Sequence, residues 1–149
     1  MTSHLGKAVM LAEEFTNAQN AHDGAKLGEL VADDVAYWDP SLPAAITGRM
    51  AVENYFKESW KSFPDANVKV LNRIESGDQV VDEVEWSGTQ KGAINVPGQP
   101  PIPPTGKRVW GKAVAVARTK AGKITSLSVY YDNMSMMTQL GLMPQPGSE

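Results

Sequence analysis

The sequence predicts an α+β fold with a mostly antiparallel sheet, and three observations support this prediction. Helical periodicity dominates residues 5–62, where one short strand pattern interrupts it. Beyond that region, strand-like segments follow one another across hairpin-length turns, which pair neighbouring strands antiparallel. The chain has 149 residues, the length of one ordinary domain, so residues 1–149 are expected to form a single unit.

Three helices and one strand are expected in the first half of the chain. In each helical segment apolar side chains recur at three- and four-residue spacing, which predicts one buried face. Pro40 ends the strand and Pro64 ends the last of these helices, because proline cannot continue either pattern. In chain order the expected elements are a helix at 5–21, a short helix with Leu27, Leu30 and Val31 facing inward, a strand over Val35–Asp39, and a helix at 49–62.

Four strands and a closing helix are expected in the second half. Ser76-Gly77-Asp78 and Thr119–Gly122 are tight turns between strand patterns. Five of the ten prolines fall within residues 97–104, so this stretch is expected to be a stiff, extended loop. The expected elements are strands at 68–74, 79–90, 108–118 and 124–131 and a helix at 133–140.

Composition excludes several kinds of site and partner. The chain has no cysteine, only two histidines and no glycine-rich phosphate loop, so neither a metal nor an organic cofactor is expected. A net charge of −3 without a basic run argues against nucleic acid as a partner. No apolar stretch approaches the ~20 residues of a membrane span, and the N-terminus lacks the pattern of a signal peptide. We therefore expect a cytoplasmic protein that binds neither nucleic acid nor membrane.

Short motifs that follow one another along nearly the whole chain suggest a family. They are Ala32-Asp33-Asp34-Val35, Ile46-Thr47-Gly48-Arg49, Ser87-Gly88-Thr89-Gln90-Lys91-Gly92, Pro103-Pro104-Thr105-Gly106-Lys107, Ala121-Gly122-Lys123-Ile124, Tyr130-Tyr131-Asp132 and Gln139-Leu140-Gly141. Their order resembles the SnoaL-like polyketide cyclase or ester cyclase group of the nuclear-transport-factor-2-like superfamily. The resemblance implies three helices packed on a strongly curved sheet that forms a cone around a pocket. It implies much less about activity, because this cone carries isomerases, cyclases, dehydratases, epoxide hydrolases and binding modules.

Strand alternation predicts which side chains enter that pocket. The turn at 119–122 sets the register of the last two strands and predicts that Trp110, Lys112, Val114 and Val116 face inward. On the neighbouring strands the predicted inward residues are Val80, Asp82, Val84, Trp86, Leu127, Val129 and Tyr131. The opposite face of Gly111, Ala113, Ala115 and Ala117 is then flat and apolar, so it is predicted to join two copies in a homodimer through the outer sheet face.

Two family activities are disfavoured by the residues present. SnoaL-like cyclases that close rings by aldol chemistry carry an acid/base aspartate on the last strand, and the resemblance places that position at Val129. Their partner histidine falls at Val114. One aspartate of the Asp-Arg-Asp set in limonene-epoxide-hydrolase-like members also falls on Val129. Since valine cannot transfer a proton, neither activity is expected.

Asp39 is the main catalytic candidate. The stretch around Trp38-Asp39-Pro40 is similar to ketosteroid isomerases, whose catalytic base occupies the position of Asp39. A carboxylate at the mouth of the cone could serve as a general base. The oxyanion donors of those isomerases are absent, since Phe15 replaces a tyrosine and an apolar residue near Val114 replaces an aspartic acid. The alternative is that Asp39 only forms a turn ahead of Pro40.

Lys112 and Tyr131 are the candidate partners of Asp39. An inward lysine would pair with Asp39 or Asp82, or bind an anionic or carbonyl group of a ligand. The alternatives are that the strand phase is displaced by one residue, or that Lys112 reaches water at the rim of the sheet. Tyr131 and Tyr37 either offer hydroxyls to the pocket or pack in the core.

The predicted pocket is apolar and rich in aromatic side chains. Its expected ligand is a small hydrophobic molecule, polycyclic or bearing a carbonyl. An enzyme of this kind would transfer protons without a cofactor, in an isomerisation, cyclisation or dehydration, with Asp39 as base and Lys112 or Tyr131 as partner. The alternative, consistent with the valines noted above, is a non-catalytic ligand-binding or structural member of the fold. The predicted lining is Phe15, Tyr37, Trp38, Trp86, Trp110, Val114 and Val129.

Overall fold

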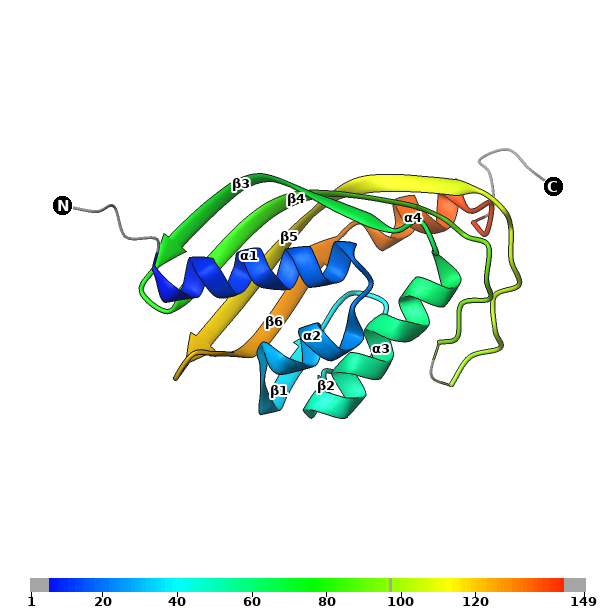
Figure 1. Cartoon of the computed structure of the whole chain (residues 1–149). Helices are drawn as coiled ribbons and strands as arrows, with labels where there is room; N and C mark the ends of the chain where they lie inside the picture. The colour runs from blue at the N-terminus through cyan, green and yellow to red at the C-terminus, as the bar shows by residue number, and fades with distance from the viewer. Residues whose placement is uncertain (1–5, 97, 144–149) are drawn as a thin grey trace.

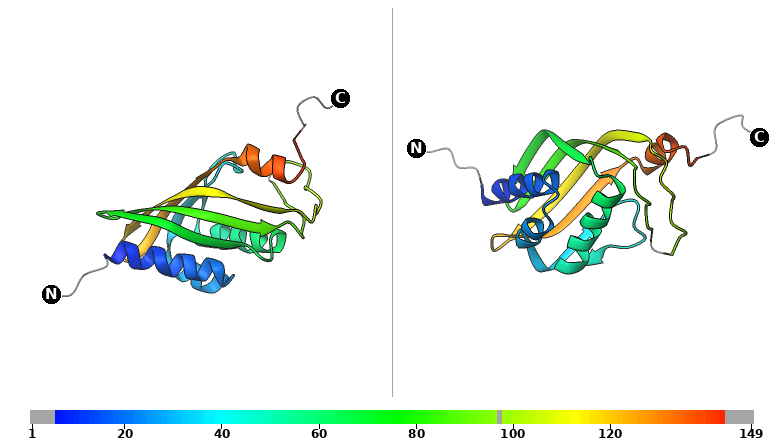
Figure 2. Two further views of the ribbon diagram at one scale, coloured as in Figure 1. Left: turned by 90° about the horizontal axis from the view of Figure 1, so that it is seen from above. Right: turned by 45° about the vertical axis from the view of Figure 1, so that its right-hand side comes forward.

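A curved sheet covered by helices on one face forms the body of the protein (Figures 1 and 2). The structure, a computed structural model, describes residues 6–96 and 98–143, in which there are six strands and four helices. In chain order they are α1 (Lys7–Asn20), α2 (Gly24–Glu29), β1 (Val31–Trp38), β2 (Ile46–Thr47), α3 (Arg49–Ser62), β3 (Asn67–Ser76), β4 (Gln79–Thr89), β5 (Arg108–Lys120), β6 (Lys123–Tyr131) and α4 (Asn133–Gln139). The predicted α+β class, with three helices before the main sheet and a short closing helix, is confirmed.

The strands lie in the order β2-β1-β6-β5-β4-β3. All neighbouring pairs are antiparallel except β1 and β6, which are parallel. This parallel pair brings the first and last strands of the chain together, with Tyr37 opposite Leu127. The sheet is therefore mostly antiparallel, as predicted.

Helices α1, α2 and α3 all pack on the concave face of the sheet (Figure 1). The apolar stripe of α1 meets that of α3 where Phe15 contacts Phe56 edge to face, with ring centroids 5.6 Å apart. Leu27 of α2 and Ile124 of β6 are fully buried in the same core. Burying a large apolar side chain contributes about 1.5–3 kcal/mol, so these contacts hold the helices against the sheet.

Helix α4 closes the sheet at the end of β6. Leu140, just after α4, is buried with Phe63 and Val109. The Gln139 amide donates to the backbone oxygen of Trp110 at 2.9 Å and accepts from the Trp110 N–H at 3.0 Å. Because β6 pairs with β5 only as far as Ala113, Gln139 satisfies backbone groups that the sheet leaves unpaired.

The proline-rich loop is held by one buried amide. The side chain of Gln90, which is fully buried, donates to the backbone oxygen of Pro103 at 3.0 Å and accepts from the Thr105 hydroxyl at 2.7 Å. A single β-bridge joins Ile94 to Ile102. The loop thus has a defined path next to α4, although it carries no regular element.

The first strand begins earlier than predicted. Val31 pairs with Ile124 in the sheet, so it belongs to β1 and not to the short helix. The register is irregular between Val31 and Ala36, and this irregularity leaves Asp33 and Asp34 exposed. Val31 is buried as predicted, but its assignment to the helix was wrong because pairing with β6 outweighs the local periodicity.

The side chains of β5 face opposite to the prediction. A regular two-residue hairpin that pairs Lys120 with Lys123 would bring Arg118 opposite Thr125, but Arg118 pairs with Ser126. Thr125 is the extra residue of a β-bulge, and its hydroxyl donates to the Arg118 backbone oxygen at 3.2 Å. Shifting the pairing by one residue turns the whole strand over. The concave face therefore carries Val109, Gly111, Ala113, Ala115 and Ala117, and the convex face carries Trp110, Lys112, Val114 and Val116.

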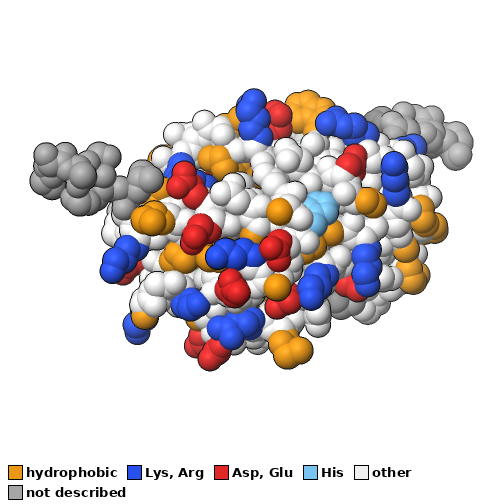
Figure 3. Space-filling view, in the orientation of Figure 1, with side chains coloured by type: hydrophobic (Ala, Val, Ile, Leu, Met, Phe, Trp, Pro, Cys, Tyr) orange, Lys and Arg blue, Asp and Glu red, His pale blue; other side chains and the backbone are white. Residues whose placement is uncertain are grey.

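The surface over the helices mixes both signs of charge. Figure 3 shows acidic and basic side chains interspersed across the face formed by α1, α2 and α3. Such a surface lacks the single-sign field that concentrates a polyanion. None of the helices in residues 6–96 and 98–143 has the length and apolar character needed to cross a bilayer.

Candidate functional site

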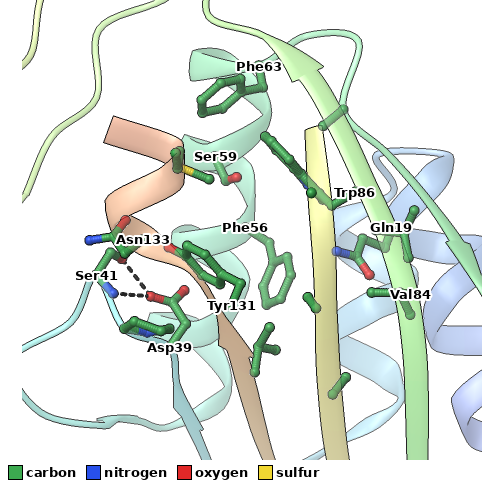
Figure 4. Close-up of a pocket in the computed structure, with 18 of the residues that line it drawn as sticks. Gln19, Asp39, Ser41, Phe56, Ser59, Phe63, Val84, Trp86, Tyr131 and Asn133 are labelled. Atoms are coloured by element: carbon green, nitrogen blue, oxygen red, sulfur yellow. Dashed lines mark hydrogen bonds between the residues drawn. The ribbon is translucent and has the colours of Figure 1, made fainter. Parts of the chain in front are cut away.

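A cavity of about 480 Å³ lies between the concave face of the sheet and helices α1 and α3 (Figure 4). Aromatic side chains form much of its wall, among them Phe15, Phe56 and Trp86. Its floor is β5, where Gly111, Ala113, Ala115 and Ala117 line the cavity. These small side chains leave the space open, because no bulky residue of β5 fills it.

Asp39 provides a carboxylate at one end of this apolar cavity. Its side chain follows β1, and the residue is only 4% exposed. The hydroxyls of Tyr37 and Tyr55 donate to Asp39 Oδ2 at 2.7 and 2.6 Å. The backbone N–H and the hydroxyl of Ser41 donate to Oδ1 at 2.8 and 2.6 Å. Segments from β1, the following turn and α3 thus converge on one carboxylate.

Four donors fill the hydrogen-bonding capacity of the Asp39 carboxylate. An ionised carboxylate offers about four lone-pair positions. In residues 6–96 and 98–143, no lysine or arginine forms an ion pair with Asp39. Its charge is therefore stabilised by neutral hydroxyl and amide donors, which is how a buried anion avoids the cost of lost hydration.

The tyrosines around Asp39 remain protonated. Burial, followed by the charge of Asp39, raises the pKa of Tyr37 well above its ordinary value. The same two causes, in the same order, raise the pKa of Tyr55 and the pKa of Tyr131. All three hydroxyls therefore keep a proton that they can donate at neutral pH.

Tyr131 presents its hydroxyl to the cavity beside Asp39. In Figure 4 the Tyr131 ring lies next to the Asp39 carboxylate, with Ser41 on the other side of that carboxylate. Tyr131 is the last residue of β6 and lies opposite Ala113, so its ring projects over the small floor of β5. A donor and a carboxylate therefore meet where a bound molecule could contact both.

Six residues predicted for the site do line the cavity: Phe15, Tyr37, Asp39, Trp86, Val129 and Tyr131. Trp86 also contacts Phe63 edge to face, with ring centroids 5.0 Å apart. Their placement agrees with the predicted phases of α1, β4 and β6. The chemical roles assigned to them stay predictions.

Four predicted site residues project from the convex face instead. The bulge at Thr125 directs Lys112, Val114 and Trp110 outward. Trp110 is 54% exposed, although it and Lys112 both border the cavity. Trp38 follows the inward Tyr37 on β1, so alternation turns it outward, where its ring lies 5.5 Å from that of Tyr130. The prediction that Val114 and Trp38 line the cavity was wrong, whereas Lys112 and Trp110 border the cavity from strand positions that face away from it.

The predicted partners of Lys112 are engaged elsewhere. Asp82 accepts two hydrogen bonds from Arg73, at 2.7 and 2.8 Å, across β3 and β4. Lys112 lies opposite Glu85 on the convex face. An inward pairing of Lys112 with Asp39 or Asp82 is therefore excluded by the strand phase.

The predicted dimer surface is also corrected. Gly111, Ala113, Ala115 and Ala117 line the cavity, so they cannot form an outer face that joins two copies. The convex face instead exposes Trp110 and Tyr130, which is 52% exposed.

Sequence reasoning missed Tyr55 and Ser41 as partners of Asp39. Tyr55 precedes Phe56 on the buried face of α3, and its hydroxyl reaches Asp39 from sixteen residues away. The only local signal was a tyrosine at the edge of an apolar helical stripe. Ser41 follows Asp39-Pro40, a pattern typical of a side chain that accepts from the backbone two residues on.

Among the residues that the structure describes, no group of three or more His, Cys, Asp or Glu side chains is arranged to hold a metal ion. The groups that face Asp39 are three hydroxyls and one backbone N–H, and all four donate hydrogen bonds to the carboxylate.

A family comparison agrees with the fold and the predicted resemblance. The family model described as a SnoaL-like domain matches residues 12–127, which is most of the chain. No curated protein matches the sequence. The resemblance drawn from the ordered motifs is thereby confirmed.

Solved structures share the fold at low sequence identity. A candidate SnoaL-like polyketide cyclase from Jannaschia sp. CCS1 is 19% identical with a TM-score of 0.82, and the alignment covers 97% of this chain and 100% of that one. A protein with a ketosteroid isomerase-like fold from Catenulispora acidiphila, solved with trimethylamine, is 24% identical with a TM-score of 0.73 and coverage of 93% and 97%. An LEH-like epoxide hydrolase from M. tuberculosis is 19% identical with a TM-score of 0.71 and coverage of 90% and 89%. At these identities the likeness concerns the fold alone.

Proposed function

Because the chain belongs to the SnoaL-like domain family, we propose that its cavity binds a small hydrophobic carbonyl compound and transfers a proton on it without a cofactor. One observation supports this most: a buried carboxylate, Asp39, stands with Tyr131 at one end of a cavity whose wall is largely aromatic and aliphatic. An apolar chamber with a few convergent polar groups is typical of a small-molecule site.

Asp39 is the proposed base and Tyr131 its hydrogen-bonding partner. Asp39 removes a proton from the carbon next to the ligand carbonyl, and Tyr131 donates its hydroxyl hydrogen to the carbonyl oxygen as negative charge develops there. Isomerisation, cyclisation and dehydration can all begin with this step. The polyketide cyclase and epoxide hydrolase names of structural relatives fit such acid–base chemistry on small molecules.

The donors around Asp39 imply how the base becomes available. Oδ1 must lose one of its two donors before it can accept a proton from a ligand. The Ser41 hydroxyl is suited to leave, since it already lies 3.1 Å from the Tyr55 hydroxyl, which offers it a second partner. Rotation of the Ser41 side chain therefore exposes Oδ1 without leaving that hydroxyl unbonded.

The alternative is a non-catalytic protein that binds ligands in the same cavity. The four hydrogen-bond donors on Asp39 support this alternative, because a carboxylate bound in this way stabilises the turn to Ser41 and the two tyrosines. The two functions differ in one respect: only the enzyme accelerates proton loss from the ligand.

Deuterium exchange on a simple ketone separates the two functions. 2-Tetralone has an apolar bicyclic body and acidic protons beside its carbonyl, and NMR in D₂O follows their replacement. If the protein is an enzyme, it accelerates this exchange. The catalysed exchange rate is then expected to fall about 10²–10⁴-fold in Asp39→Asn, which is the usual contribution of a general base. Binding of 2-tetralone with exchange no faster than in buffer would favour the non-catalytic alternative.

We also propose that two copies associate through the convex face of the sheet. Trp110 and Tyr130 are large apolar side chains exposed on that face, with Val114 opposite Tyr130 at its centre. Exposed apolar patches of this kind mark association surfaces. In sedimentation velocity the wild type is expected to have the mass of two chains, and Val114→Arg that of one. A wild type that stays a single chain at high concentration contradicts the dimer.

A further inference from the structure

Gln19 is a polar residue beside the buried stripe of helix α1. The buried residues of this stripe include Ala8, Ala12, Phe15 and Ala18, and Gln19 lies at its border, one residue after Ala18. Gln19 is half-buried and lines the cavity. A polar amide in the wall of an apolar chamber costs free energy unless it finds a hydrogen-bond partner.

The protein itself supplies no such partner in the part of the chain that the structure describes. Figure 4 shows the Gln19 amide directed from α1 toward the space bounded by Phe56, Val84 and Trp86. No hydrogen bond joins its side chain to any residue of 6–96 or 98–143. The residues that it faces in the figure are apolar, so its hydrogen-bond partner is either water or a bound ligand.

The helix end that carries Gln19 is fastened by the neighbouring residue, Asn20. The Asn20 amide donates to the Val68 backbone oxygen at 2.8 Å and accepts from the Val68 N–H at 2.7 Å. These two bonds fasten the end of α1 to the edge strand β3. The backbone that carries Gln19 is therefore fixed beside the cavity before a ligand arrives, and a fixed attachment point favours binding.

Gln19 and the Asp39–Tyr131 pair project from different walls of the cavity. Asp39 and Tyr131 come from the ends of β1 and β6, whereas Gln19 comes from α1 and faces β4 (Figure 4). Between them lie the aromatic and aliphatic walls. We propose that Gln19 is a second polar anchor, so that the preferred ligand has an apolar body with a hydrogen-bonding oxygen at each end. This inference rests on the proposed function and adds a specificity-determining residue to it.

Calorimetric titration with matched aromatic alcohols tests the assignment. Each pair differs by one distal hydroxyl: 2-naphthol and 2,6-dihydroxynaphthalene, then 4-phenylphenol and 4,4′-dihydroxybiphenyl. Two lengths are used so that one diol can span the separation of the anchors. One neutral hydrogen bond increases affinity about fivefold, and the two equivalent orientations of a diol add about twofold, so the better diol is expected to bind about tenfold tighter than its mono-ol.

The variant Gln19→Met removes the amide and keeps the length and helix propensity of the side chain. Its expected diol-to-mono-ol affinity ratio falls to about two, the orientational factor alone. Asn17→Met changes an exposed residue of the same helix that does not line the cavity, and it should retain the wild-type ratio. Gln19→Leu replaces Gln19→Met if thermal unfolding shows that the latter does not fold.

Each result bears on one of the two proposals. A mono-ol that binds without any gain from the second hydroxyl overturns the assignment of Gln19, since water alone then satisfies the amide. A gain that survives Gln19→Met overturns it as well. If none of the four alcohols binds to the wild type, the small-molecule function of the cavity itself is contradicted.

Discussion

Ala115 lies directly opposite Val129 in the β5–β6 pair, and both side chains point into the cavity. This pairing places the small residues of β5 under the aromatic side chains contributed by the helices. Had the hairpin been regular, Val114 would have taken the place of Ala115 and narrowed the same space. The single bulge at Thr125 thus determines the size of the chamber as well as the composition of the convex face.

A larger side chain on the floor of the cavity should weaken ligand binding. Ala115→Phe places a ring inside the chamber of about 480 Å³, so affinity for 2-naphthol is expected to fall at least about tenfold in calorimetric titration. Val114→Phe makes a similar increase on the convex face and should leave that affinity unchanged. Equal effects of the two substitutions would contradict the strand phase described above.

The sequence was sufficient for the class and order of the elements because amphipathic periods recur along most of the chain. It was insufficient for the phase of β5, since both faces of that strand are apolar. Val114 and Val116 alternate with Ala113, Ala115 and Ala117, so hydrophobicity alone does not identify the inner face. The position of a bulge depends on how two strands pair, which alternation within one strand does not reveal.

Part of the site could be predicted, because some of its residues belong to local sequence patterns. Asp39 was recognisable from its local motif, and Tyr131 from its place on the last strand. Tyr55 meets them only because α3 crosses the end of β1, and Gln19 only because α1 covers β4. Contacts between distant segments of this kind follow from the packing of elements, for which a single sequence provides no direct signal.

Replacing the Asp39 carboxylate should destabilise the fold more than removing one of its donors. In Asp39→Asn an amide nitrogen replaces one carboxylate oxygen and cannot accept the hydrogen bonds that this oxygen accepted. Each buried donor left without a partner lowers the free energy of unfolding by about 1–3 kcal/mol. We expect a loss of about 3 kcal/mol in urea unfolding for Asp39→Asn and about 1.5 kcal/mol for Tyr55→Phe. Ser59→Ala, on the same helix and cavity wall, is the control and should be nearly neutral. An Asp39→Asn variant as stable as the wild type would show that the hydroxyl donors do not need a charged partner.

Alkaline pH should unfold the protein through its buried tyrosines. The folded-state pKa values of Tyr37, Tyr55 and Tyr131 lie above the unfolded value of about 10. Their stabilising contribution is therefore complete below pH ~10 and is lost as pH rises through the folded-state values. Absorbance at 295 nm, which reports tyrosinate, should rise for these three residues together with the loss of circular dichroism. Their ionisation in a protein that remains folded would contradict this coupling.

Removing one charge of the Arg73–Asp82 pair should lower the free energy of unfolding much more than replacing both residues by apolar ones. The two residues face each other across β3 and β4, and their side chains are only 17% and 10% exposed. Removing one charge leaves the other buried without its partner, so Asp82→Asn is expected to lower the free energy of unfolding by about 3 kcal/mol. The double variant Arg73→Leu with Asp82→Leu should recover most of this loss, because neither charge then needs a partner. Glu58→Gln breaks the exposed pair with Lys61 and should cost less than about 1 kcal/mol. A double variant that is less stable than Asp82→Asn would contradict this expectation. The ion pair would then stabilise the fold beyond the balance of its two buried charges.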